Sequence, residues 1–318
     1  MARNARPLDG VLLFDKPLQL SSNTALQKVR RLFQAEKAGH TGTLDPLATG
    51  LLPICFGEAT KFSTGLLDAD KTYRALVKLG QTTTTGDAEG EITRRCEVTL
   101  SELQVHGVLH DFTGEISQVP PMHSALKHQG KPLYEYIRKG ETIERASRNV
   151  TIHELVLERF VGDEMEISVR CSKGTYVRTL AEDIGNALGC GAHLRGLRRM
   201  AIAGFSLDNA YSLEQLEAMS MTERDACLLS LDCMLLDIPM IELDEAQVTR
   251  MAQGQKLGVD AGLPDGKIRL YGKGKFIGVA ELLGRRLAPD RLLSSVAKRA
   301  ACIEGSVENF NSDIPVKT

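Results

Sequence analysis

The chain has 318 residues, which suggests a large domain with a smaller one beside it. A content of 42% hydrophobic and 25% charged residues is typical of a soluble globular protein and argues against a chain that cannot bury a core. The formal net charge of −2 does not by itself indicate a nucleic-acid binder, so any basic surface must be local. The clusters of basic residues are Lys28, Arg30, Arg31 and Lys37; Arg195, Arg198 and Arg199; and Arg285 and Arg286.

Cysteine usage and the N-terminal residues narrow the class of protein further. The seven cysteines are scattered and include no C-x-x-C pair, which argues against a disulfide framework and against a zinc site. The basic N-terminal residues are followed by a short apolar stretch at residues 11–14, which is too short for a signal peptide or a membrane span. We therefore expect a protein of the reducing cytoplasm without a membrane association.

The first 60 residues predict two buried strands and one helix. Residues 11–14 and 51–56 are apolar runs of strand length, and the Ser-Ser-Asn sequence at residues 21–23 offers N-caps for a helix. The apolar face of this helix is formed by Leu26, Val29, Leu32 and Phe33. Residues 39–50 contain three glycines and a proline, and they predict a loop before the second strand.

The middle of the chain predicts a strand at residues 71–79, polar turns at residues 81–90 and a helix at residues 101–112. Residues 120–148 are basic, polar and interrupted by prolines. We therefore expect this segment to be an insertion over the surface and not part of the core.

Residues 165–171 form the clearest predicted strand, because apolar and polar side chains alternate along them. Gly174 and Thr175 then turn the chain into a helix that starts near Thr175. The apolar positions of this helix are Val177, Leu180, Ala181, Ile184 and Leu188.

After about residue 240 the pattern changes to short strands joined by Gly-rich turns, at residues 267–271, 275–282 and 285–293. These strands predict a small all-β module. The overall pattern is an α+β body over residues 1–240, a module over residues 241–300 and a polar tail over residues 301–318 that we expect to be frayed.

The Gly-rich loop at residues 39–50 is the segment richest in candidate chemistry. Pro46 disfavours helical geometry at Asp45, so this aspartate should lie in extended or turn backbone. The flanking glycines let the backbone approach a ligand closely. Residue types alone leave a second interpretation open, because an Asp-Pro pair in such a loop is commonly a simple turn.

A second candidate is Arg178, which falls in the first turn of the predicted helix after residue 175. A cation there opposes the helix dipole at a cost of roughly 0.3–1 kcal/mol. A nearby carboxylate is the simplest compensation, and a side chain that extends into water is the alternative.

Five blocks resemble the TruB-type tRNA pseudouridine-55 synthases, in the same order as in that family and across residues 9–293. The first block begins with the signature Gly39-His40-Thr41-Gly42-Thr43-Leu44-Asp45-Pro46-Leu47-Ala48-Thr49-Gly50-Leu51-Leu52-Pro53. It continues through Gly57-Glu58-Ala59-Thr60-Lys61. The other four are Asp70-Lys71-Thr72-Tyr73-Arg74, Ser124-Ala125-Leu126-Lys127, Cys171-Ser172-Lys173-Gly174-Thr175-Tyr176-Val177-Arg178-Thr179-Leu180 and Leu197-Arg198-Arg199. One departure is Gln19, which stands where the family's Asp-Lys-Pro-x-Gly-x-Ser-Ser pattern has glycine, and a positive φ there would make glutamine costly.

The resemblance implies a fold and a reaction. The fold would be an α+β catalytic domain with a mixed, mainly antiparallel sheet, an RNA-gripping insertion at about residues 120–148 and a small PUA-like RNA-binding domain. The reaction would convert a uridine in the T loop of tRNA to pseudouridine, with cleavage of N1–C1′, rotation of the base and formation of C5–C1′. Such a redox-neutral isomerisation needs no cofactor and no metal.

Residue roles follow from the same resemblance. Asp45 is the implied catalytic carboxylate, and a free Asp, with a pKa of about 3.9, is ionised at neutral pH. Tyr73 would stack on the target uracil near C5, and Arg178 would pair with Asp45. Tyr176 and Leu197 would line the pocket, and His40 would fill the space left by the flipped nucleotide.

Basic residues outside the catalytic group are implied to contact RNA. Lys16 and Lys61 match basic positions near the site, where either a phosphate contact or a structural role is possible. The residues implied to grip RNA from the insertion are Lys127, Lys131, Arg138 and Lys139.

Three alternatives remain open on the sequence. Asp45 could attack C1′ covalently or take the C2′ proton. The related guide-RNA-dependent synthases share the Asp motif, although the insertion and the small C-terminal module favour an enzyme that acts alone. An RNA chaperone of tRNA is a rival from another class. We expect a monomer that binds the T stem-loop of tRNA and needs no protein partner.

Overall fold

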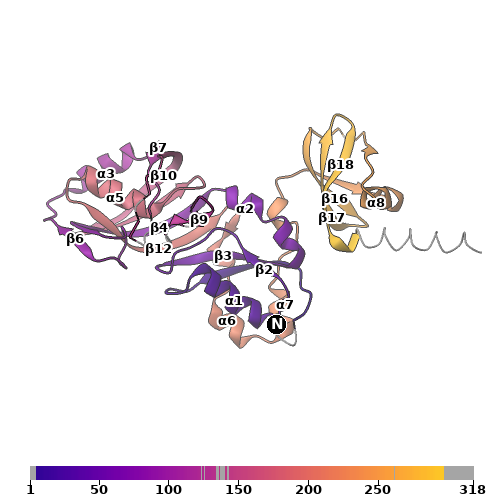
Figure 1. Cartoon of the computed structure of the whole chain (residues 1–318), viewed down its shortest axis with the longest axis horizontal. Helices are drawn as coiled ribbons and strands as arrows, with labels where there is room; N and C mark the ends of the chain where they lie inside the picture. Colours follow the sequence, from indigo (N-terminus) through magenta and orange to yellow (C-terminus); the bar gives the residue numbers. More distant parts are fainter. Residues whose placement is uncertain are drawn as a thin grey trace, which may run out of the picture.

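The computed structural model describes residues 5–296, except residues 123, 125, 134–135, 137–139, 142 and 261. The described chain is elongated, with the main sheet running through the body and a separate C-terminal module at one end (Figure 1). Within these residues, no helix is long and apolar enough to cross a membrane.

The body is built on one nine-stranded sheet with the order β1-β3-β12-β4-β11-β10-β7, in which β2 pairs with β3 and β13 with β12. The pairing of β3 with β12 is parallel, and the other pairings of this sheet are antiparallel. The strands are β1 Gly10–Lys16, β2 Ala38–His40, β3 Ala48–Phe56, β4 Lys71–Leu79, β7 Gly114–Gln118, β10 Arg148–Val161, β11 Glu164–Cys171, β12 Ala192–Ile202 and β13 Phe205–Ser206. The expected α+β class with a mixed, mainly antiparallel sheet is therefore confirmed.

Two hydrophobic clusters hold the two halves of this sheet. Helix α1 (Ser22–Leu32) packs its apolar face against β1 and β3. Helices α3 (Glu102–Asp111) and α5 (Val177–Ala187) pack against β4, β10 and β11 in the other half. Strands β12 and β4 are paired where the two halves meet. A site at this junction is therefore supported by both hydrophobic clusters.

Shorter elements complete the body. The helices and 3₁₀ turns are η1 Gly57–Lys61, α2 Thr64–Asp68, η2 Leu207–Asn209, α6 Leu213–Ala218, α7 Met221–Ala226 and η3 Cys233–Leu235. Strand β5 (Gln81–Thr83) pairs with β6 (Ile92–Arg95), so the segment predicted as turns starts with a short strand.

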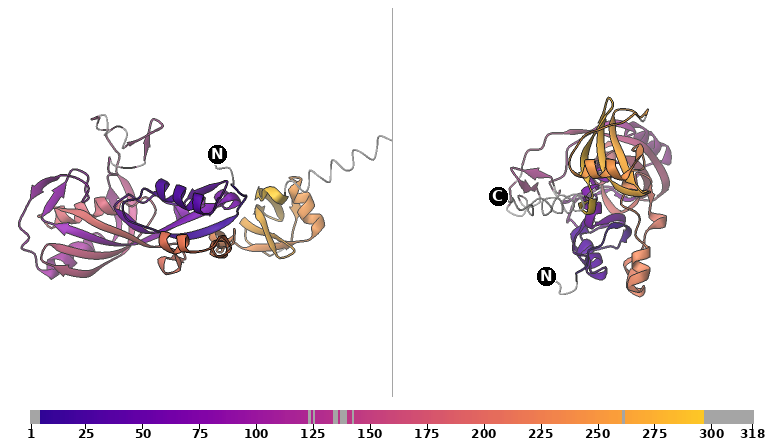
Figure 2. Two further views of the ribbon diagram at one scale, coloured as in Figure 1. Left: turned by 90° about the horizontal axis from the view of Figure 1, so that it is seen from below. Right: turned by 90° about the vertical axis from the view of Figure 1, so that its right-hand side faces the viewer.

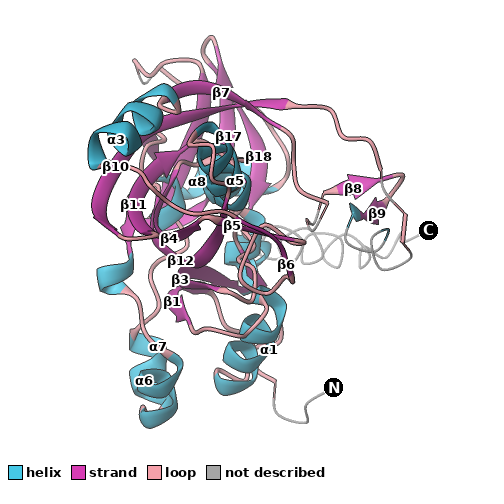
Figure 3. Cartoon of the chain, turned by 90° about the vertical axis from the view of Figure 1, so that its left-hand side faces the viewer, coloured by secondary structure: helices cyan, strands magenta, loops and turns pink. Residues whose placement is uncertain are grey.

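The described part of the segment between β7 and β10 leaves the sheet and extends away from the body (Figure 2). Its described part contains a short hairpin of β8 (Lys127–His128) and β9 (Lys131–Pro132). The hairpin stands apart from the main sheet when the molecule is viewed from its end (Figure 3). This placement agrees with the expectation of a surface insertion.

The C-terminal module has its own five-stranded sheet, ordered β14-β16-β17-β18-β15, and its own hydrophobic cluster. The strands are β14 Met240–Leu243, β15 Leu257–Gly258, β16 Gly266–Gly272, β17 Lys275–Leu283 and β18 Arg286–Leu292. Contrary to the expectation of an all-β module, it also contains helix α8 (Glu245–Ala252). Met251 of α8 is fully buried in the module's hydrophobic cluster. The core of the module is therefore formed by the sheet and this helix together.

Candidate active site

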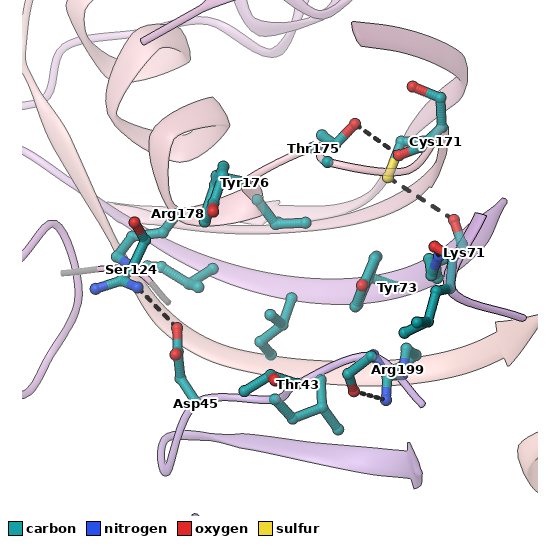
Figure 4. Close-up of a pocket in the computed structure, with 18 residues that line it drawn as sticks. Thr43, Asp45, Lys71, Tyr73, Ser124, Cys171, Thr175, Tyr176, Arg178 and Arg199 are labelled. Carbon is teal, nitrogen blue, oxygen red and sulfur yellow. Dashed lines mark hydrogen bonds and ion pairs between the residues drawn. The ribbon is translucent and has the colours of Figure 1, made fainter. Parts of the chain in front are cut away.

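Asp45 lies at the rim of a pocket of about 280 Å³ that opens between the two halves of the main sheet (Figure 4). Its loop connects β2 to β3, and Asp45 O accepts a hydrogen bond from Ala48 N at 3.0 Å, which closes a tight turn before β3. Among the residues that line the pocket, Asp45 is the one carboxylate. Its side chain is 51% exposed, so it can reach a bound molecule.

Arg178 is held between two carboxylates. Its Nη2 lies 2.8 Å from Asp45 Oδ2, and its Nη1 lies 3.1 Å from Asp87 Oδ2. The Arg178 and Asp87 side chains are only 7% and 4% exposed, respectively. Arg178 is the second residue of α5, so the two carboxylates offset the unfavourable helix dipole. The expected pairing of Arg178 with Asp45 is confirmed, although its catalytic role stays a prediction.

Asp87 lies in the segment predicted as polar turns, where no motif marks it as a site residue. Its backbone oxygen accepts a hydrogen bond from Thr83 Oγ1 at 2.7 Å, and its Oδ1 accepts one from Thr85 Oγ1 at 2.6 Å. Burial, with the nearby charges of Asp87 and Asp45, raises the pKa of Glu89. The carboxylates of Asp45, Asp87 and Glu89 therefore lie near the Arg178 guanidinium, and the Lys16 ammonium group also interacts with Asp45 and Glu89.

Tyr73 and Arg199 face each other across β4 and β12, where they are paired in the register of the two strands. Burial raises the pKa of Tyr73, while the adjacent Arg199 guanidinium opposes this shift. The resting phenol is therefore protonated at neutral pH. Tyr73 lines the pocket, as the resemblance implied.

Arg199 connects the pocket to the Asp45 loop, although the sequence assigned it no role. Its Nε donates to Leu51 O at 2.7 Å and its Nη2 donates to Gly42 O at 2.9 Å. Gly42 has a φ of 71°, and a Cβ added there would lie 3.2 Å from Arg199 Nη1. Gly50 has a φ of 101°, and a Cβ there would lie 2.4 Å from Arg199 O. These two glycines therefore let the Asp45 loop and β3 lie against β12. The feature of the sequence that pointed to Arg199 was its place in the Leu197-Arg198-Arg199 block.

Lys71 is a second buried cation of the pocket that sequence reasoning did not assign. Its Nζ donates to Leu67 O at 2.7 Å and to Ala69 O at 2.6 Å, at the C-terminal end of α2. Burial lowers the pKa of Lys71, with a smaller contribution from Arg199. Both cations lie in the wall of the pocket near Tyr73.

Three other residues implied by the resemblance lie in or near this site. Tyr176 and Leu197 line the pocket. His40 lies at the end of β2, where burial and the Arg199 charge lower its pKa, so its ring is neutral at pH 7. His40 Nδ1 is buried and has no hydrogen-bond partner among the described residues. His40 is not among the residues that line the pocket.

The two lysines for which a phosphate contact was considered are both engaged in other contacts. Lys16 is fully buried, and its Nζ donates to Pro17 O at 2.9 Å and to Leu20 O at 2.6 Å. Lys61 lies outside the pocket, where its Nζ contacts Glu58 Oε2 at 2.8 Å and Ser294 Oγ at 2.9 Å. This second lysine therefore joins the body to the C-terminal module, and the geometry favours the structural alternative for both.

The residues of the insertion are less fully described. Lys127 and Lys131 belong to the β8–β9 hairpin, and Lys131 is exposed. Arg138 and Lys139 lie outside the described residues. In the part of the chain that is described, no group of three or more His, Cys, Asp or Glu side chains is placed to hold a metal ion.

Solved structures share this architecture. A chain in the crystal structure of a Cbf5-Nop10-Gar1 complex superposes with a TM-score of 0.68 at 24% identity, over 89% of this chain and 84% of that chain. A chain in the structure of an H/ACA RNP bound to a substrate RNA containing 2'-deoxyuridine gives a TM-score of 0.67 at 22% identity, over 89% and 84%. The fold is therefore of the Cbf5 class.

Family models and relatives then define the chain more narrowly. The N-terminal domain of the TruB family pseudouridylate synthases matches residues 30–177, the C-terminal domain of tRNA pseudouridylate synthase B matches residues 178–240, and the C-terminal region of pseudouridine synthase II TruB matches residues 239–293. The tRNA pseudouridine synthase B of Methylobacillus flagellatus is 58% identical, over 92% of this chain and 97% of the relative. That of Burkholderia mallei is 54% identical, over 92% and 99%. The chain belongs to the TruB family of pseudouridylate synthases.

Proposed function

We propose that this protein converts uridine to pseudouridine at position 55, in the T loop of tRNA. The observation that carries the proposal is the identity of 54–58%, over 92% of the chain, to relatives named tRNA pseudouridine synthase B. The pocket supports it, because one exposed carboxylate stands beside a buried arginine and a buried tyrosine.

The reaction exchanges one glycosidic bond for another. The N1–C1′ bond breaks, the uracil turns, and C5 bonds to C1′; the proton on C5 is lost and N1 gains one, so the product is an isomer of the substrate. Asp45 supplies the carboxylate that acts on the sugar, either as a nucleophile at C1′ or as a base at C2′. A hydrolytic glycosidase usually presents two carboxylates to the bond. Here Asp87 is buried behind Arg178, which suits an isomerisation better than hydrolysis.

The other residues of the pocket receive roles from their positions. Arg178 orients the Asp45 carboxylate through the 2.8 Å contact. Tyr73 stacks on the uracil near C5, and burial raises the pKa of its phenol although the Arg199 guanidinium partly opposes this shift. Tyr176 and Leu197 form the walls around the base. The target base must leave its stack to enter this pocket, and His40 fills the space it leaves.

RNA binding is assigned to two parts of the chain outside the pocket. The insertion contributes Lys127, Lys131, Arg138 and Lys139, and the PUA-like domain at residues 241–300 contributes a second surface beside the catalytic domain at residues 1–240. Phosphate contacts from these parts supply affinity, while the shape of the T loop supplies recognition. The protein acts in the cytoplasm, as a monomer and without a guide RNA.

A reaction with purified components tests the function directly. The protein is incubated with an unmodified tRNA transcript, without guide RNA or another protein, and pseudouridine is mapped chemically along the RNA. We expect modification at position 55 and none in a transcript that carries cytidine there. Absence of pseudouridine, or modification only at other positions, would contradict the assignment. A requirement for added guide RNA would instead support the guide-dependent class.

A further inference from the structure

The backbone of the Asp45 loop is held on both sides of the aspartate by residues from the N-terminal segment. Leu44 N donates a hydrogen bond to Ser22 Oγ at 2.7 Å, and Ser22 Oγ donates one to Leu44 O at 2.9 Å. On the other side, Gln19 N donates to Pro46 O at 2.9 Å. The peptide groups that flank Asp45 are therefore fixed, while its carboxylate remains 51% exposed at the pocket.

Ser22 is well suited to fix this loop because it is itself immobilised. It is the first residue of α1 and only 2% exposed, and Leu44 is 3% exposed. Helix α1 is anchored in the core by Ala25 and Val29, both fully buried. Since buried peptide groups need hydrogen-bond partners, loss of the Ser22 hydroxyl would leave a donor and an acceptor of Leu44 to find new ones.

The second contact comes from a strained position. Gln19 adopts a φ of 66°, the left-handed region that a glycine would occupy without cost. The positive φ considered in the sequence analysis is therefore present, and glutamine is strained at this position relative to glycine. Lys16 helps to hold this conformation, because its ammonium group binds the carbonyls of Pro17 and Leu20 around the turn. A strained residue that is kept next to a reactive loop is typical of functional constraint.

We propose that Ser22 is a positioning residue for catalysis, which sets the backbone of Leu44 and through it the direction of the Asp45 carboxylate. The inference rests on the proposed function. The contact with Arg178 orients the end of the Asp45 side chain, but the position of its Cα depends on the loop. Misplacement of a reacting group by about 1 Å can lower a rate about a hundredfold, so a flexible Leu44 peptide should be visible in the rate.

The test compares three variants with the wild type. Ser22→Ala removes both hydrogen bonds to Leu44, and Ser22→Thr restores a hydroxyl. Ser21→Ala is the matched control, because Ser21 Oγ caps the same helix by accepting from Thr24 N at 3.1 Å but makes no contact with Leu44. Each protein is assayed for kcat, tRNA affinity and melting temperature. Hydrogen exchange of the peptide that spans residues 40–50 is measured without RNA.

We expect Ser22→Ala to lose between about ten- and a hundredfold in kcat with tRNA affinity within about twofold of wild type. Ser22→Thr should recover most of the rate, and Ser21→Ala should keep it despite a similar loss of thermal stability. Faster exchange of residues 40–50 should appear in Ser22→Ala alone. Equal rates for Ser22→Ala and Ser21→Ala, or unchanged exchange in the loop, would overturn the proposal. A wild type without activity would contradict the proposed function. In that case the hydrogen-exchange measurement would still show whether Ser22 holds the backbone of residues 40–50.

Discussion

Arg178 Nη1 lies 3.1 Å from Asp87 Oδ2, and both side chains are almost completely buried. The guanidinium therefore has an anchor that does not depend on Asp45, whose carboxylate is half exposed. If Asp45 engages the sugar as proposed, we expect its contact with Arg178 to weaken, and the buried contact with Asp87 would keep Arg178 in place. We therefore predict that Asp87 acts as an anchor for Arg178 during the reaction.

Replacing Asp87 with Asn should test this anchoring role. The variant keeps the shape of the side chain but removes the charge that faces Arg178, so we expect a loss of at least tenfold in kcat. Stability should fall by about 1–3 kcal/mol, because a buried charged partner is lost while Asp45 still pairs with Arg178. Asp68→Asn, which breaks the exposed pair with Lys173, is the control and should change neither quantity appreciably. If Asp87→Asn had the kcat of the wild type, the contact with Asp45 alone would be sufficient to hold Arg178 in place.

Asp45→Asn should fold and bind tRNA but form no detectable pseudouridine. The physical reason is that the amide neither attacks C1′ nor accepts a proton as a carboxylate does, and Asp45 is the one carboxylate that lines the pocket. Single-turnover assays with enzyme in excess, together with binding titrations, provide the measurement. Substantial turnover by a sequence-verified preparation would exclude the mechanism. Continued promotion of tRNA folding by the inactive variant would show a separate chaperone activity.

The parts of the fold that could be predicted are those in which apolar and polar residues recur with a clear strand or helix period, or in which a local capping motif is present. Strand β4 and the N-terminal cap of α1 occur where the alternation and the serines place them. Strand β12 was not predicted, because register shifts at residues 194–196 and 199–201 break its period of two. Helix α8 has a local signal in the sequence, since Asp244 and Gln247 form a capping box at its N-terminus.

The site was predictable to the extent that its residues lie in local motifs. Asp45 and Arg178 belong to motifs, and the position of Arg178 at a helix start indicated that a carboxylate should lie nearby. Asp87 could not be found in this way, because its partner lies far along the chain and its own neighbours predict an ordinary turn. The role of Arg199 likewise depends on carbonyl groups of the Asp45 loop and β3 that only the folded sheet brings within reach.

Activity should persist in excess EDTA without any added cofactor. The reaction is redox-neutral, and the described residues provide no cluster that could hold a metal. We expect rates within about twofold of those without EDTA, provided that monovalent salt keeps the tRNA folded. Melting of the tRNA is followed in the same buffer as a control. Loss of activity that a metal restores while the tRNA remains folded throughout would contradict the prediction.

Lys16 should make the stability of the protein depend on pH in the alkaline range. Burial lowers its pKa from 10.5 to about 8. Between these values the folded state releases a proton that the unfolded state keeps, so stability relative to Lys16→Met should rise with pH. The slope is greatest between the two pKa values, at up to about 1.4 kcal/mol per pH unit. It falls away as the pH drops through 8, where Lys16 becomes protonated in both states, and as the pH rises above 10.5, where Lys16 is neutral in both states. Denaturant unfolding of both proteins at several pH values measures the difference. Parallel stability curves would mean that the pKa of Lys16 is not lowered.

The insertion should govern affinity for tRNA more than the rate of the reaction. Reversing the charges of Lys127, Lys131, Arg138 and Lys139 should weaken binding and flatten its salt dependence. Each lost phosphate contact removes about 0.7–0.9 from the slope of log K against log salt, because fewer counterions are released. The rate at saturating tRNA should fall less than the affinity, since Asp45, Tyr73 and Arg178 are unchanged.

Some loss of rate is still expected if the insertion helps to hold the flipped conformation. A matched comparison uses two reversals on the hairpin, Lys127→Glu with Lys131→Glu, against two on the exposed strand β6, Arg94→Glu with Arg95→Glu. Both pairs change the net charge equally, so a general electrostatic effect would lower affinity in both. Binding titrations at several salt concentrations distinguish the cases. If the hairpin pair left both slope and affinity at wild-type values, the insertion would be a solvated surface loop that does not contact RNA.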